Sequence, residues 1–191
     1  MSRAVGAIER LAPERAALLV VDIQERLVPA MPSEVVPQLV RNVKILVEAA
    51  TRLGLPIVVS QQYPKGLGVT IPELSDVLPE TTHRFDKVEF SAASARGFTD
   101  LDDVLADRDQ WIVTGMETHV CVYQSVRDLV ERRTVHVVRD AVASRTKANW
   151  RAGLDLMDRL GAVTTTTEVC VFDLLERAGT DNFKALSKTI K

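Results

Sequence analysis

The sequence predicts an α/β fold in which a mainly parallel β-sheet lies between two layers of helices. Short apolar runs alternate along the chain with longer segments whose apolar residues recur at helical spacing. Strands and helices in regular alternation imply crossover connections, which join parallel strands. The 191 residues, 46% of them hydrophobic, are enough for one domain with a sizeable core. We therefore expect residues 1–191 to form a single three-layer α/β/α sandwich.

Five apolar runs are predicted to form the strands of this sheet. The first, Ala16–Ile23, is apolar except at Asp22, a pattern typical of a strand buried on both faces. The other four runs are Pro56–Ser60, Trp111–Thr114, Val135–Arg139 and Ala162–Thr165. The last of them is the weakest.

Five segments carry the helical pattern: Ser33–Leu53, Thr118–Arg132, Ala148–Leu160, Glu168–Arg177 and the tail Asp181–Lys191. Gly54 and Gly161 follow the first and third of these, where helix C-caps favour glycine. The tail places apolar Phe183, Leu186 and Ile190 at helical spacing. It either packs onto its own domain or forms a contact between subunits.

One long stretch, Gln61–Asp100, is predicted to be irregular because prolines and glycines interrupt it, with a short helical pattern only near Pro72–Val77. Long excursions inside a compact domain are commonly functional. In an open parallel sheet the ligand crevice lies beyond the carboxyl ends of the strands. Asp22, Ser60–Gln62 and Gly115 close three of the predicted strands, so we expect them to meet at that edge.

The charge balance excludes several classes of partner. The chain has 24 Lys and Arg against 26 Asp and Glu, interspersed, for a formal charge of −2. Nucleic acid and an anionic membrane surface are therefore not expected as partners. The N-terminal residues look like neither a signal nor a transit peptide, and the longest apolar run is too short to span a bilayer. Two cysteines without a Cys-x-x-Cys pair fit a reducing cytoplasm.

Cys121 lies near the start of a predicted helix, directly after a predicted strand. The first turn of a helix leaves backbone N–H groups unpaired, and their partial positive charge favours a thiolate and can hold an oxyanion. Taken alone, this cysteine is equally well explained as a small buried hydrophobic residue. Asp22 could act as a base for it, and Lys87 could balance both charges. Separately, Asp22 could be a loop anchor and Lys87 a surface charge.

Three motifs together resemble the isochorismatase-like cysteine hydrolases, a family that includes nicotinamidases and N-carbamoyl amidases. They are Val20–Gln24, Lys87–Ser91 and Gly115–Val122. The resemblance implies a catalytic triad of Asp22, Lys87 and Cys121. It also implies a cis peptide at Met116–Glu117 and an oxyanion hole made by the N–H groups of Glu117 and Cys121. We expect substrate among Gln62, Tyr63, Phe90 and Thr118.

The chain is most similar to the subgroup of isochorismatase domain-containing proteins, through the segments 61–68, 71–74 and 140–145. It departs from nicotinamidases, which carry an Asp-x-His motif after the second strand as part of a metal site. Here that place reads Ser60–Gln61–Gln62, and His83, His119 and His136 show no ligand spacing. We expect neither a metal nor another cofactor.

Three hypotheses for function follow. The first is hydrolysis of a small amide or ureide through an acyl-enzyme on Cys121, by a protein that assembles as a homo-oligomer like its family. The second is vinyl ether hydrolysis of the isochorismatase type, with Asp22 as general acid. The third is a non-catalytic binding or redox-sensing protein with a reactive thiol. A dinucleotide-binding Rossmann domain is excluded because no G-x-G-x-x-G follows the first strand.

Overall fold

A six-stranded, fully parallel sheet forms the centre of the part of the chain that the structure describes. This computed structural model describes residues 8–101 and 104–190. The strands are β1 (Ala16–Val21), β2 (Ile57–Gln62), β3 (His83–Lys87), β4 (Gln110–Met116), β5 (Thr134–Ala143) and β6 (Val163–Thr165). They pair in the order β3-β2-β1-β4-β5-β6. All five predicted strands are therefore confirmed, with longer bounds for β4 and β5.

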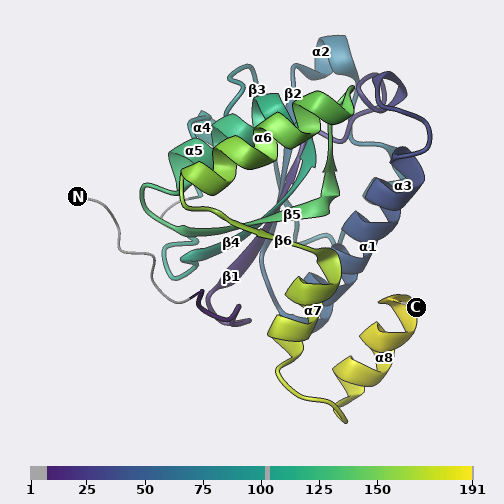
Figure 1. The fold of residues 1–191 in the computed structure, drawn as a ribbon, viewed down its shortest axis with the longest axis vertical. Helices are drawn as coiled ribbons and strands as arrows, with labels where there is room; N and C mark the ends of the chain where they lie inside the picture. The colour runs from purple at the N-terminus through teal and green to yellow at the C-terminus, as the bar shows by residue number, and fades with distance from the viewer. Residues whose placement is uncertain (1–7, 102–103, 191) are drawn as a thin grey trace.

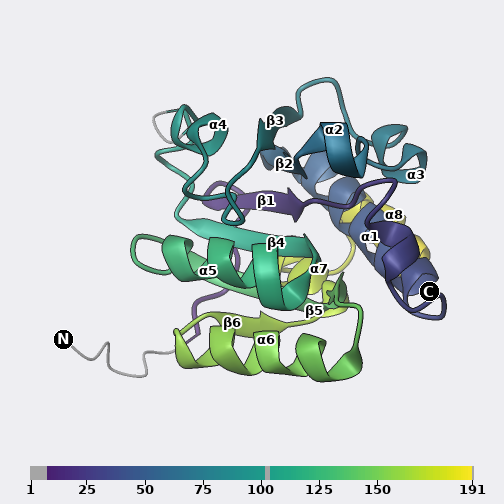
Figure 2. The ribbon, with the colours of Figure 1, turned by 90° about the horizontal axis from the view of Figure 1, so that it is seen from above.

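Helices cover both faces of the sheet, which confirms the predicted three-layer architecture (Figure 1). One face carries α1 (Val36–Leu53), α7 (Thr167–Leu175) and α8 (Asp181–Ile190). The other carries α4 (Arg96–Thr99), α5 (Tyr123–Leu129) and α6 (Lys147–Arg159). Figure 2 shows α1 and α8 on one side of the strands and α5 and α6 on the other.

The alternation of side chains along β1 explains why its sequence is apolar throughout. Leu18 and Val20 belong to the core under α1, whereas Ala17, Leu19 and Val21 belong to the core under α5 and α6. All of them are at most 1% exposed. A strand at the centre of a parallel sheet is covered on both faces, so it reads as a continuous apolar run.

The predicted helices form close to their expected bounds. Gly54 ends α1 in the left-handed conformation at φ 73°, as the glycine rule for C-caps predicts. The segment predicted as one helix from Thr118 begins instead as a π-helical turn, η2 (Thr118–Val122), and continues as α5. Short helical turns complete the set: η1 (Val28–Ala30), α2 (Pro64–Leu67) and α3 (Pro72–Ser75).

The prediction that residues 61–100 are irregular is wrong at β3. His83–Lys87 pairs in parallel with β2 and forms one edge of the sheet. The side chains of this strand are charged or aromatic, and only Lys87 is buried. Charged edge strands are common because they discourage pairing with other chains. Such a strand lacks the apolar run on which the other strand predictions depend.

The C-terminal helix α8 packs onto its own domain. Leu186 is fully buried in the core under α1. The Arg41 guanidinium donates to the carbonyls of Thr189 and Ile190, and the Thr189 hydroxyl donates to Glu48. Lys191 lies outside the described residues, and a subunit contact through the tail stays a prediction. Within the described ranges no helix has the length and apolar character needed to cross a membrane.

Candidate active site

Asp22 directly follows β1 and is fully buried at the carboxyl edge of the sheet. Its backbone has a φ of 51°, which turns the chain sharply away from the strand. The Ser60 hydroxyl donates to Asp22 Oδ1 over 2.7 Å, and Lys87 Nζ donates to Oδ2 over 2.7 Å. Both carboxylate oxygens are therefore engaged from strands on the same side of β1.

The Lys87 ammonium is held inside the protein by four acceptors. β3 ends at Lys87, whose side chain is fully buried. Besides Asp22, Nζ donates to Gln62 Oε1 over 2.6 Å and to the carbonyls of Glu89 and Phe90 over 3.2 Å each. A buried charge of either sign is tolerated only when it is paired and hydrogen-bonded. The alternative that Lys87 is a solvated surface charge is thus excluded.

Cys121 lies in η2, against both members of this ion pair. Its side chain is buried, with 6% of the residue exposed. The pKa of the thiol is raised to about 12, mainly by burial. The Asp22 carboxylate also raises this pKa and the Lys87 ammonium lowers it, each through charge and a side-chain hydrogen bond. Desolvation and the neighbouring carboxylate thus outweigh the ammonium, although the start of a helix favours a thiolate. The thiol lies next to a carboxylate.

The turn before the nucleophile has the expected backbone. The peptide bond Met116–Glu117 is cis. The Glu117 carbonyl accepts hydrogen bonds from the N–H groups of Val120 and Val122, which flank Cys121. The Glu117 side chain is nearly buried, and one of its oxygens accepts both the backbone N–H and the Nε–H of Arg145, each over 3.0 Å. The carboxylate thus ties this turn to the end of β5.

The four predicted substrate contacts differ in their surroundings. Gln62 already uses its side-chain amide within the protein, on Lys87 and on the Val88 carbonyl. The aromatic residues Tyr63 and Phe90 are about half exposed, at 53% and 54%. Thr118 is fully buried, and its hydroxyl has no hydrogen-bond partner among the described residues. An unpartnered buried hydroxyl is costly unless a ligand or water completes it.

Sequence reasoning did not identify Ser125 as part of the site. Its fully buried hydroxyl donates to the Cys121 carbonyl over 2.6 Å and accepts the Ala92 N–H over 2.7 Å. This hydroxyl joins the nucleophile turn to the segment that holds Lys87. The only signal in the sequence is the spacing, because residues four apart on a helix share a face.

The histidines lie on separate elements. His83 is on β3, His136 is on β5, and His119 is in η2, where its Nδ1 lies 3.1 Å from the Ser144 hydroxyl. Across residues 8–101 and 104–190, no cluster of three or more His, Cys, Asp or Glu side chains is placed to hold a metal ion.

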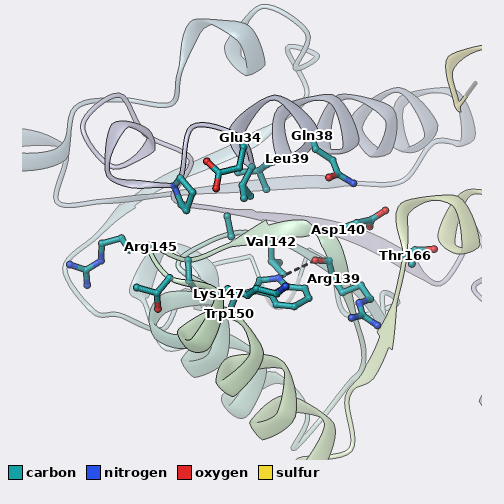
Figure 3. Close-up of a pocket in the computed structure, with 15 residues that line it drawn as sticks. Glu34, Gln38, Leu39, Arg139, Asp140, Val142, Arg145, Lys147, Trp150 and Thr166 are labelled. Carbon is teal, nitrogen blue, oxygen red and sulfur yellow. Dashed lines mark hydrogen bonds between the residues drawn. The ribbon is translucent and has the colours of Figure 1, made fainter.

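A large cavity lies near Asp22, Lys87 and Cys121, but its walls are formed by other residues. Its volume is about 670 Å³, and it opens between the start of α1, the end of β5 and the start of α6 (Figure 3). Trp150 lies on its α6 wall and donates to the Arg139 carbonyl. Gln38 of α1 and Glu34, in the turn before α1, lie on the opposite wall. Asp22, Lys87 and Cys121 do not line it. Arg145, which bonds to Glu117, is its link to the triad.

Comparison with known proteins identifies the family. The model of the isochorismatase domain matches residues 16–169. The chain belongs to the isochorismatase family. The secreted isochorismatase effector Isc1 of Phytophthora sojae is 36% identical over 194 residues, covering 100% of this chain and 91% of that protein. The mouse isochorismatase domain-containing protein 2A is 32% identical, with coverage of 100% and 90%.

Among solved structures, the MAR1 ribonuclease of Caenorhabditis elegans superposes with a TM-score of 0.89 at 37% identity. The match covers 95% of this chain and 92% of that one. The expected family and its three-layer fold are therefore confirmed, and the chain is a member of the isochorismatase-like hydrolases.

Proposed function

We propose that this protein hydrolyses a small amide, ureide or related compound through a covalent acyl-enzyme on Cys121. The observation that carries the proposal is the buried Asp22–Lys87 ion pair, which interacts directly with the thiol. A thiol with a carboxylate beside it has the base that a nucleophile requires, and the ammonium balances the charge that the pair would otherwise leave uncompensated.

Each step moves a proton between Asp22, the thiol and the leaving group. Asp22 takes the Cys121 proton as sulfur attacks the carbonyl carbon, and the N–H groups of Glu117 and Cys121 receive the oxyanion. As the C–N bond breaks, Asp22 returns the proton to the departing nitrogen. Water then attacks the thioester, giving one proton to Asp22 and releasing the acid, and that proton returns to sulfur. Substrate lies among Gln62, Tyr63, Phe90 and Thr118.

The test is turnover of a panel of small amides, ureides and esters by the wild-type protein, Cys121→Ala and the matched control Cys170→Ala. Cys170 is the other cysteine of the chain and is fully buried in the opposite core. We expect the control to retain activity and Cys121→Ala to lose all detectable turnover. Substantial activity in Cys121→Ala would contradict the covalent route.

That contradicting result is the one predicted by vinyl ether hydrolysis, in which Asp22 protonates the substrate and no bond to sulfur forms. The redox-sensing alternative is disfavoured, because sensor cysteines have low pKa values and the pKa of Cys121 is raised. The name ribonuclease belongs to the nematode relative. For this chain the formal charge of −2 disfavours RNA as substrate. A cytoplasmic homo-oligomer without a cofactor completes the proposal.

A further inference from the structure

The side-chain amide of Gln62 is engaged at both ends. Its Oε1 accepts from Lys87 Nζ over 2.6 Å, the shortest hydrogen bond of that ammonium. Its Nε2 donates to the Val88 carbonyl over 2.9 Å. The amide therefore bonds to Lys87 through its oxygen and to Val88, the next residue, through its nitrogen. A side chain that was expected to contact substrate is thus hydrogen-bonded to Lys87 instead of being free.

The backbone of Gln62 is held equally firmly by Gln24, which is fully buried. Gln24 Oε1 accepts the Gln62 N–H over 2.7 Å, and its Nε2 donates to the Gln62 carbonyl over 3.0 Å and to the Gly68 carbonyl over 2.6 Å. Two glutamines thus fix the position from which Oε1 reaches Lys87. The backbone and the side chain of Gln62 are both restrained by hydrogen bonds inside the protein.

Charge distinguishes Gln62 from the other side chain that holds Lys87. Asp22 is an anion, whereas Gln62 and the two backbone carbonyls are neutral acceptors. An ammonium between one carboxylate and three neutral acceptors keeps its electrostatic effect on a neighbouring thiol. A second carboxylate in place of the amide would cancel most of that effect.

We propose that Gln62 is a positioning residue that holds the Lys87 ammonium beside Asp22 and Cys121 without neutralising its charge. The inference deepens the proposed function and rests on it, because the ammonium is useful only if Cys121 becomes an anion. It assigns Gln62 a role toward Lys87 that is separate from substrate contact.

The experiment measures the rate of iodoacetamide alkylation of Cys121 between pH 7 and 9.5, by intact mass, in a Cys170→Ala background. Gln62→Glu keeps the size of the side chain and adds one negative charge next to Lys87. We expect it to slow alkylation by about tenfold or more at each pH, because one pKa unit changes the thiolate fraction tenfold.

Gln61→Glu is the matched control. Gln61 precedes Gln62 on β2, so its side chain points to the other face of the strand, where it bonds to Thr70 and Asp86. Gln61→Glu adds the same charge to the protein as Gln62→Glu does, and we expect its alkylation rate to lie within about twofold of the parent's. Equal rates in Gln62→Glu and the parent would overturn the proposal. Equal slowing in both glutamate variants would also overturn it, since the effect would then be one of net charge.

Gln62→Met provides a second variant with no acceptor and no charge. It removes the shortest hydrogen bond of the Lys87 ammonium without adding a charge, so we expect alkylation about threefold slower than in the parent, a smaller effect than in Gln62→Glu. Alkylation of Gln62→Met as fast as the parent or faster would overturn the positioning role, and this readout stands even if Gln62→Glu fails to fold. Alkylation can be measured without any turnover. If the Gln62 variants change the alkylation rate as expected but no compound of the panel is hydrolysed, the proposed function alone is refuted. Turnover without a Gln62 effect would refute this inference alone.

Discussion

Lys87→Met removes the ammonium that pairs with Asp22 while keeping the length of the side chain. Both members of the pair are fully buried and lie 2.7 Å apart. The variant leaves a buried carboxylate with neutral partners, the Ser60 hydroxyl and the Cys121 thiol, and leaves Gln62 and two backbone carbonyls without their donor. Breaking such a pair from one side costs about 3–5 kcal/mol. For a chain of this size that loss lowers Tm by roughly 6–20 °C.

The assay is urea unfolding followed by circular dichroism, with Asp22→Asn/Lys87→Met as the matched comparison. The double variant removes the stranded charge, so we expect it to regain about 2 kcal/mol or more of the stability lost in the single variant. A loss below about 1 kcal/mol in Lys87→Met would refute the reasoning, since that is the range of exposed pairs. A double variant as unstable as the single one would refute it as well.

Three further predictions concern the surroundings of the site. Gly115→Ala is expected to give no folded protein by gel filtration, because Gly115 has a φ of 116° and a Cβ there would lie 2.0 Å from the Val21 carbonyl oxygen. A variant whose Tm equals that of the wild type would contradict this prediction. Ser125→Ala leaves the buried Ala92 N–H without an acceptor and should lose about 1–3 kcal/mol in urea unfolding, with less than about 0.5 kcal/mol as the contradicting result. Burial lowers the pKa of His136, so on acidification the unfolded chain takes up the proton first, and the stability present above about pH 6.5 is lost as the pH falls. His136→Leu should therefore make the free energy of unfolding depend less steeply on pH between about pH 7.5 and 5. Equal slopes in the variant and the wild type would contradict the assignment.

The sequence was sufficient to predict the elements with buried apolar faces. β1, β4 and β5 lie in the middle of the sheet, and α1 presents one apolar face to it, so burial left a clear pattern in each. β3 has no such apolar pattern, because its side chains are mostly polar and its pairing with β2 depends on backbone hydrogen bonds. The sequence pattern records which side chains are buried and carries little information on a polar edge strand.

The site shows the same division. Asp22 and Cys121 adjoin apolar strands, so their meeting at the sheet edge followed from the predicted topology. Lys87 was named as a possible partner of both, and the resemblance supported it, but the strand that carries it was not predicted. The raised pKa of the Cys121 thiol was not predicted, because it depends on how deeply the side chain is buried and on the Asp22 charge. Those are properties of the packed site and of no single segment.

The hydrogen bonds that surround Asp22, Lys87 and Cys121 could not be obtained from the sequence, although Ser60 was expected at the same edge as Asp22. Ser60, Gln24 and Ser125 are common polar residues, and each makes between one and three hydrogen bonds, most of them to groups far away along the chain. Their roles depend on distances between strands and turns that become defined only when the sheet closes over the site.

The central claim is that Cys121 forms a covalent bond to the acyl group of the substrate. Intact-mass spectrometry of wild type, Cys121→Ala and Cys170→Ala, quenched in acid during reaction with the panel of amides, ureides and esters, tests it most directly. The account predicts a mass increase equal to the acyl group in wild type and in Cys170→Ala, mapped to the peptide of Cys121, and none in Cys121→Ala. Full turnover of a panel compound by Cys121→Ala, or an adduct carried only by Cys170, would contradict it.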